Sequence, residues 1–300
     1  MNENDIRPNT FLIGAQKSAT TSLYNWIAQH PDVCGPESIK DYPFFIKEEL
    51  YEKGIESLKE EYIKEGYSKQ KIVLQGSVQY MFFEESIDRI YSFDPNSKLI
   101  LILRNPVDRA ISAYNYFKKL NIETLSFPKA IAEEEVRLKG DLRTICDLTY
   151  ISHGYYFKQL SNIYKKFSKE QVLVLFFDDV NNNPDETTKE VFKFLEVSED
   201  FKPNYKRLNV TGSVRFKVLQ NLIFNKSKTK KILVDTIIDP LIPLHKRTKL
   251  RWWFKEWNTK KENINKDVLY TSEREELKLQ FREDIEKLEN LLRVDLSHWK

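Results

Sequence analysis

Four short apolar runs constrain the fold of this chain more than any other feature. They are rich in Ile, Leu, Val and Phe, and they cover residues 11–13, 72–74, 99–103 and 172–177. Runs this short and this uniformly apolar are typical of parallel strands that are covered on both faces. We therefore predict an α/β fold in which a central parallel sheet is flanked by helices.

Helical patterns fill the intervals between these runs. Apolar residues recur three and four positions apart within residues 23–27, 107–117, 157–167 and 272–292. A proline followed by two acids, in Asn183-Pro184-Asp185-Glu186, is a typical helix start. The chain has 300 residues, 41% of them hydrophobic, which is enough for a sizeable core. We predict a single domain over residues 1–300.

The ends and the cysteines of the chain bear on its location. Residues 1–10 are too polar for a secretory signal, and no stretch approaches the ~20 apolar residues of a membrane span. The two cysteines, Cys34 and Cys146, are too few for a disulfide framework. No histidines or cysteines have metal-ligand spacing. We expect a cytoplasmic protein with no transmembrane segment and no bound metal.

Positive charge is concentrated in residues 226–261, which hold eleven Lys and Arg against three acids, although the whole chain carries only +3. This asymmetry indicates an anionic partner, but a solvated basic surface would look the same. Aromatic residues between the cations, as in the segment 251–257, suit stacking on sugars or packing onto the core. We interpret residues 226–267 as a basic, aromatic insertion or lid. A non-enzymatic module that binds nucleic acid or anionic lipid through this segment is an alternative, although we expect no nucleic-acid partner.

The segment Thr10–Tyr24 combines the first apolar run with a tight loop and a helix start. Backbone N–H groups at a helix N-terminus attract anions, and the helix dipole adds to this attraction. Gly14 permits the turn and Lys17 adds a cation, while the loop hydroxyls could either bind a phosphate or merely cap the helix. The spacing excludes a nucleotide-triphosphate loop, because no glycine directly precedes Lys17. The shorter loop favours a single 5′-phosphate.

A second candidate anion site follows the third apolar run. Arg104 stands where that strand should end, and Pro106 should open the next helix. Ligands of open parallel sheets bind outside the carboxyl ends of the strands. Ser112 lies about two helical turns further on, so Arg104 and Ser112 could hold one phosphate between them.

These two motifs, in this order, resemble those of the sulfotransferases that use 3′-phosphoadenosine 5′-phosphosulfate. The resemblance is strongest to the carbohydrate branch, typified by the heparan sulfate sulfotransferases and their bacterial relatives. Further similar segments are residues 30–33, 40–45, 154–160 and 286–299. The resemblance implies a three-layer P-loop-like fold, and transfer of a sulfuryl group to a hydroxyl or amine, with a glycan as the expected acceptor. Adenosine 3′,5′-bisphosphate would be the product, and no metal would be needed.

The resemblance also implies the residues of the donor site. These are Gly14, Lys17, Ser18, Ala19, Thr20, Thr21, Ser22, Arg104, Ser112, Tyr156 and Arg215. Lys17 would contact the 5′-phosphate and the bridging oxygen, and Tyr156 would lie near the adenosine. Arg104 and Ser112 would hold the 3′-phosphate.

The implied catalytic residues are Lys17 and Asp41. Asp41 stands where the family has its catalytic glutamate, so it would be the base, with Glu37 and His153 as alternatives. Gly76 stands where relatives often have a lysine, so we expect a second cation from Lys40 or Arg215.

A kinase-like phosphotransferase that uses ATP and Mg²⁺ is the alternative enzyme. Its support is the segment from Val172 to Asp179, which we predict to be an apolar strand ending in Asp178-Asp179, where the two carboxylates could hold Mg²⁺. The absence of a Gly-Lys-[Ser/Thr] sequence counts against this alternative.

Overall fold

The computed structural model describes residues 6–205, 212–214, 250, 257, 259–261 and 270–300. A five-stranded sheet in the order β2-β3-β1-β4-β5 forms its centre, and every neighbouring pair of strands is parallel. The strands are β1 (Thr10–Gly14), β2 (Val33–Cys34), β3 (Ile72–Gly76), β4 (Lys98–Leu103) and β5 (Val172–Phe176). The predicted parallel sheet is confirmed, and β2 is an addition whose two residues are too few to form a sequence pattern.

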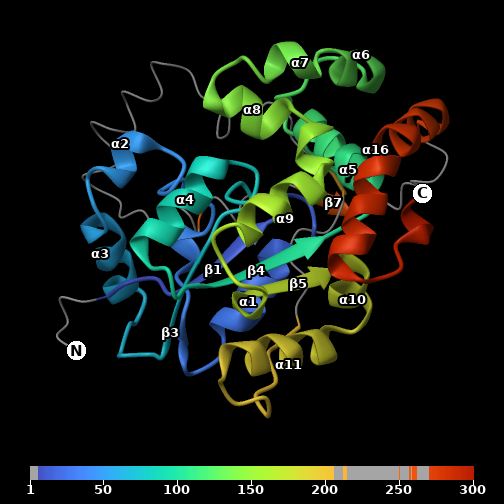
Figure 1. Ribbon diagram of the computed structural model, residues 1–300. Helices are drawn as coiled ribbons and strands as arrows, with labels where there is room; N and C mark the ends of the chain where they lie inside the picture. The colour runs from blue at the N-terminus through green and yellow to red at the C-terminus, as the bar shows by residue number, and fades with distance from the viewer. Residues whose placement is uncertain (1–5, 206–211, 215–249, 251–256, 258, 262–269) are drawn as a thin grey trace.

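Helices cover both faces of this sheet (Figure 1). One face carries α1 (Thr20–Ala28), α10 (Phe177–Asn182) and α11 (Pro184–Leu195). The other carries α3 (Glu56–Lys64), α4 (Glu84–Phe93), α5 (Pro106–Lys119), α9 (Tyr156–Tyr164) and α16 (Thr271–Leu292). Shorter helices are α2 (Glu48–Tyr51), α6 (Phe127–Ala132), α7 (Glu134–Arg137) and α8 (Leu142–Leu148). Single 3₁₀ turns cover Glu37–Ile39, Ser152–Gly154, Lys169–Gln171 and Ser297–Trp299.

The side chains of β4 explain why the fold has three layers. Leu99, Leu101 and Leu103 are buried in the core that includes α5, α9 and α16. Ile100 and Ile102 are buried in the core that includes α1 and α11. Because successive residues of a strand point to opposite faces, one continuous apolar run contributes to both cores. The predicted three-layer α/β fold is confirmed.

Two contacts hold α16 against the other helices on its face of the sheet, where Figure 1 shows it beside α5 and α9. Gly154 lies so close to this helix that a Cβ atom there would come within 2.8 Å of the Phe281 ring. A carboxylate oxygen of Asp284 accepts a hydrogen bond from the backbone N–H of Phe157 at 3.1 Å. The middle of α16 is therefore held against the start of α9.

The order of the strands creates a crevice at one edge of the sheet. From β1 the chain runs to β2 and β3 on one side, whereas from β4 it runs to β5 on the other. Connections that leave two neighbouring strands in opposite directions open a crevice at their carboxyl ends, where ligands of such sheets bind. Both predicted anion motifs begin at this edge, one after β1 and one after β4.

A separate two-stranded pairing closes a long excursion of the chain. β6 (Gly212–Val214) pairs antiparallel with β7 (Thr259–Lys261), so the two ends of this excursion meet. Arg215 and nearly all of residues 226–267 lie outside the described residues, and the roles suggested for them stay predictions. Among the helices that the structure describes, none is long and apolar enough to cross a bilayer.

Candidate active site

The loop between β1 and α1 has the backbone of an anion site. Lys17 and Ala19 both adopt left-handed conformations, with φ values of 68° and 63°. Left-handed residues within a loop turn successive N–H groups toward one point and so form an anion-binding concavity. Ala19 is the N-cap of α1, and no side chain caps this helix. The N–H groups in the first turn of α1 can therefore donate hydrogen bonds to an anion. Because no side chain caps the helix, capping does not explain why the loop carries hydroxyl side chains.

Close packing holds this loop in place. A Cβ atom on Gly14 would come within 2.4 Å of the Met81 sulfur, so only glycine fits without a shift of that side chain. The Ser18 side chain is fully buried, and its hydroxyl has no hydrogen-bond partner among the described residues. A buried polar group of this kind calls for a partner, and a ligand oxygen would supply one.

Arg104 extends from the end of β4 to the same loop. Its Nη1 donates a hydrogen bond to the backbone oxygen of Lys17 at 3.0 Å, and its guanidinium lies 4.3 Å from the centre of the Phe177 ring. Burial lowers the pKa of Arg104, but a guanidinium remains charged in proteins. The two anion motifs, read separately in the sequence, are thus in direct contact.

Helix α5 presents one polar face toward this point. Asn105 caps the helix by accepting hydrogen bonds from the N–H groups of Val107 and Asp108. Asp108, Ser112 and Tyr116 follow at intervals of four residues and so share a face. Ser112 is only partly buried. It is therefore accessible on the helix that begins directly after Arg104.

Tyr116 connects the donor loop with the predicted base. The Lys17 Nζ lies 3.8 Å above the centre of its ring, a cation–π distance. Burial raises the pKa of Tyr116 to about 12, and the negative charges of Asp41 and Asp147 add to this rise while Lys40 opposes it. Lys17 therefore contacts the Tyr116 ring, and the charge of Asp41 acts on the same side chain.

Asp41 is fixed beside the end of β3. Its N–H donates to the Gly76 oxygen at 2.7 Å, and its Oδ1 accepts from the Val78 N–H at 3.1 Å. Its Oδ2 accepts from the Lys40 Nζ at 2.7 Å, and its side chain is 42% exposed. The residue is therefore fixed by three contacts, two of which orient its carboxylate, and the carboxylate is still accessible to an acceptor.

Lys40 and Gly76 both lie near the ring of Tyr24. The Lys40 side chain is only 5% exposed, and its Nζ lies 6.0 Å from the Tyr24 ring centre. The same ring lies 3.1 Å from the position of a Cβ atom on Gly76. Tyr24 thus fills the space next to Gly76, where a larger side chain would collide, and Lys40 brings a cation to the same region.

The two alternative bases, His153 and Glu37, lie in different surroundings from Asp41. His153 is buried, its Nε2 donates to the Ile145 oxygen at 3.2 Å, and its ring stacks on Phe82. Burial, and next the charge of Arg109, lower the pKa of His153 to about 3. This histidine is part of the core and is not accessible as a base. Glu37 lies in a 3₁₀ turn that the Glu65 carboxylate holds through backbone N–H groups.

Tyr156 begins α9 and is buried at 1% exposure. Its ring lies 6.3 Å from that of Trp299, and burial raises its pKa to about 12. The charge of Arg104 opposes this rise, which indicates that the two residues are neighbours. Its predicted contact with adenosine stays a prediction.

Sequence reasoning missed two glutamines that attach α8 to the ends of two strands, Gln16 after β1 and Gln79 after β3. Gln16 and Gln79 each donate a hydrogen bond at 3.0 Å to the backbone oxygen of Cys146. Gln16 stands directly before Lys17, a position that could have suggested a role. Tyr116 was also missed, although it lies one helical turn after Ser112 on the same face.

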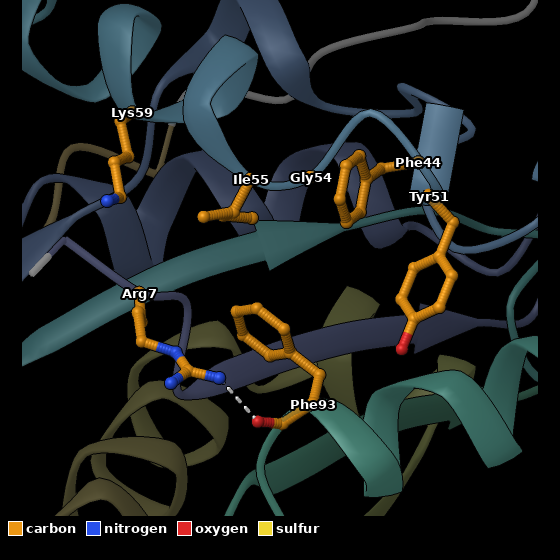
Figure 2. Close-up of a pocket in the computed structure, with 7 residues that line it drawn as sticks. All are labelled: Arg7, Phe44, Tyr51, Gly54, Ile55, Lys59 and Phe93. Atoms are coloured by element: carbon orange, nitrogen blue, oxygen red, sulfur yellow. Dashed lines mark hydrogen bonds between the residues drawn. The ribbon is translucent and has the colours of Figure 1, made fainter. Parts of the chain in front are cut away.

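A cavity of about 330 Å³ lies away from this edge of the sheet (Figure 2). In Figure 2 the side chains of Ile55 and Phe44 face those of Arg7 and Phe93 across it. Arg7 precedes β1 and Phe93 ends the helix before β4, so the cavity belongs to the amino-terminal edge of the sheet. It is separate from the two anion motifs.

The support for an Mg²⁺-dependent kinase does not persist in the structure. Strand β5 ends at Phe176, and Asp178 and Asp179 are exposed in the first turn of α10. The prediction that they end a strand is wrong, because acids are favoured in the first turn of a helix. Within the described ranges, no group of three His, Cys, Asp or Glu residues could hold a metal ion.

The P-loop-like α/β fold thus brings the two candidate anion motifs into contact at the edge of the sheet where Asp41 also lies. The family model described as "Sulfotransferase domain" matches residues 7–251, and the chain belongs to this family. It is a sulfotransferase, and the kinase alternative finds no support.

Several relatives of the chain are named for the sulfation of heparan sulfate. The chain is 29% identical over 270 residues to heparan sulfate glucosamine 3-O-sulfotransferase 5 of Mus musculus and of Homo sapiens, and the match covers 84% of this chain and 70% of each relative. It is 28% identical over 208 residues to the bifunctional heparan sulfate N-deacetylase/N-sulfotransferase 4 of Mus musculus, covering 66% of this chain and 23% of that protein. The crystal structure of a sulfotransferase from Alicyclobacillus acidocaldarius is similar with a TM-score of 0.69, at 26% identity, over 98% of this chain and 99% of that one.

Proposed function

We propose that this enzyme transfers the sulfuryl group of 3′-phosphoadenosine 5′-phosphosulfate to a hydroxyl group of a glycan. One observation carries the proposal: Arg104 at the end of β4 donates to the backbone of Lys17, so the two anion sites adjoin. A nucleotide with a phosphate on each side of its ribose needs two such sites close together. The uncapped start of α1 suits the 5′-phosphate, and the pair Arg104 and Ser112 suits the 3′-phosphate.

Lys17 is proposed to stabilise the charge that develops during transfer. The donor, when bound, supplies an activated sulfuryl group whose leaving group is the 5′-phosphate. Lys17 and the N–H groups of the loop can hold the growing negative charge on that phosphate without a metal. The cation–π contact with Tyr116 keeps the Lys17 Nζ next to the site before the donor arrives.

Asp41 is proposed as the base for the acceptor. Its exposed carboxylate can accept the proton of a hydroxyl group that lies within hydrogen-bond reach. Lys40 contacts that carboxylate and is proposed as the second cation near the transferred group. A common reaction centre is supported by the contact of Lys17 with Tyr116 and by the effect of the Asp41 charge on the pKa of the same tyrosine.

A glycan acceptor is inferred from the relatives, whose names describe O- and N-sulfation of heparan sulfate. The eleven cations within residues 226–261 suit an acceptor that already carries negative charge. A carboxylate as base suits a hydroxyl group at least as well as an amine, so we favour O-sulfation.

The decisive experiment incubates the enzyme with ³⁵S-labelled donor and paired polysaccharides. One member of each pair has free amino groups, and the other has the same amino groups acetylated. We expect label in both members, because hydroxyl groups are present in both. Label confined to the free amine would show N-sulfation, and label in neither, while a small phenol or alcohol is labelled, would reject the glycan acceptor. No transfer to any acceptor, together with no binding of adenosine 3′,5′-bisphosphate, would reject the activity itself.

A further inference from the structure

The start of α16 lies over the face of α5 that carries Ser112. Arg274 Nη1 donates to the Asp108 Oδ1 at 2.8 Å, and the Tyr270 hydroxyl donates to the Asn115 Oδ1 at 3.4 Å. Asp108, Ser112 and Asn115 are spaced by four and three residues, so they share one face of α5. Ser112 therefore lies between the two residues that contact the start of α16.

Two guanidinium groups come close together at this point. Burial lowers the pKa of Arg104, the Asp108 and Asp178 carboxylates oppose that effect, and the positive charge of Arg274 adds to it. Arg274 contacts Asp108 directly, and its side chain is 19% exposed while that of Asp108 is 41% exposed. Water therefore screens the charge of Arg274 only partly.

We propose that Arg274 is a third ligand of the 3′-phosphate, beside Arg104 and Ser112. The inference rests on the proposed function, since it assumes that the 3′-phosphate binds at Arg104. A phosphate with two negative charges can accept from two guanidinium groups, and each can present a planar pair of N–H donors. In the ligand-free protein, Asp108 provides the negative charge that Arg274 faces, and a bound phosphate would compete with it.

This assignment also explains why α16 is part of the site. The helix begins at Thr271, 152 residues after α5 ends at Lys119, yet its first turn reaches α5 through the contact between Arg274 and Asp108. Arg274 would then connect occupancy of the nucleotide site with the position of the carboxyl-terminal helix.

The test compares two nucleotides that differ only in the group of interest. Affinities for adenosine 3′,5′-bisphosphate and for adenosine 5′-monophosphate are measured by calorimetry in the wild type and in Arg274→Gln. The loss of a charge-assisted contact should lower the affinity for the bisphosphate by roughly 10- to 100-fold. The monophosphate should bind almost as before, because it has no 3′-phosphate. Arg282→Gln, on an exposed position of the same helix, is the matched control and should change neither affinity.

Asp108→Asn separates a phosphate ligand from a structural ion pair. This variant breaks the same ion pair from the other side but removes a negative charge from the phosphate site. If Arg274 binds the phosphate, Asp108→Asn should raise the preference for the bisphosphate while Arg274→Gln lowers it. If the pair only attaches α16 to α5, both variants should lower the melting temperature alike and leave the preference unchanged, which would overturn the proposal.

A conservative variant covers the case in which Arg274→Gln fails to fold. Arg274→Lys retains the charge and the ion pair but loses the planar fork, so its preference for the bisphosphate should be intermediate. A preference equal to that of the wild type would then count against the proposal. A wild type with no preference for the bisphosphate would instead reject the donor site as a whole, and the two failures are thereby distinguishable.

Discussion

The proposed donor half and the proposed acceptor half of the site are built by different means. The donor half consists of the loop Gly14–Thr21 with Arg104 and Ser112, and it relies on backbone N–H groups and on residues that directly follow strands. The acceptor half consists of Lys40, Asp41 and Tyr116, which come from a loop and from the middle of a helix. The sheet topology dictates the first arrangement, whereas individual side-chain contacts dictate the second.

This difference teaches which properties the fold confers and which the side chains add. Any sequence that forms β1, β4 and the helices after them places two anion sites at one edge of the sheet. The identity of the base, its reach and its partner cation depend on a few residues. Substitutions in the acceptor half should therefore change the rate of transfer and spare nucleotide affinity, and those at Arg104 and Ser112 should do the reverse.

The largest effect is expected in the acceptor half, from Asp41→Asn. Removal of the general base should lower kcat by roughly 10²–10⁴. Affinity for adenosine 3′,5′-bisphosphate should stay almost unchanged, because the hydrogen bonds described for Asp41 go to Gly76, Val78 and Lys40, outside the donor loop. Steady-state transfer assays and calorimetry measure the two quantities. Glu37→Gln is the matched control, and full activity in Asp41→Asn with loss of activity in Glu37→Gln would exchange their roles.

Lys17→Ala tests the residue at which the two halves meet. It should lower kcat by roughly 10²–10³, the effect of losing one donor that stabilises developing charge. The loop should persist, since alanine tolerates the left-handed conformation about as well as lysine does. Single-turnover rates measure the chemical step directly, and Lys17→Arg should recover part of the rate. A near-normal rate in Lys17→Ala would remove this residue from the chemistry and leave the loop backbone as the main contributor.

The same division explains how much of the molecule could be predicted from its sequence. The strands β1, β3, β4 and β5, the helices after β1 and β4, and the donor motifs are local patterns, and each was recognisable in a contiguous segment. Contacts across the chain were not recognisable: the N–H of Asp41 binds the oxygen of Gly76, and Arg274 binds Asp108 from 166 residues away. The role of Tyr24 beside Gly76 likewise requires the packing of α1 on β3.

Burial was the other property that the sequence could not supply. His153 looked like a possible base because of its residue type and its position before Gly154. The structure encloses its ring between Phe82 and the Ile145 carbonyl, which a residue pattern does not reveal. Asp178 and Asp179 were misassigned for a related reason, since the chain turns into α10 directly after β5 and carries both side chains outward.

Arg104→Gln should produce the largest effect on binding in the donor half. Loss of a charged contact should lower the affinity for adenosine 3′,5′-bisphosphate by roughly 10- to 100-fold. The affinity for adenosine 5′-monophosphate should fall less, because this nucleotide is affected only by loss of the hydrogen bond from Arg104 to the Lys17 oxygen. Calorimetric titration with both nucleotides measures the difference. An equal loss for both nucleotides would mean that Arg104 supports the loop and does not bind the 3′-phosphate.

Ser112→Ala should have the smallest effect, about three- to tenfold on affinity for the bisphosphate, because one neutral donor is lost. Its value lies in combination with Arg104→Gln. If both residues bind the same phosphate, removal of one leaves the other with a displaced or more hydrated partner, and the double variant should lose less than the sum of the two single losses in free energy. Strict additivity would mean that the two side chains act on separate parts of the nucleotide. In that case the 3′-phosphate site would have to be assigned to Arg104 with other residues of the crevice, and the contact between the two anion motifs would no longer define how the donor lies.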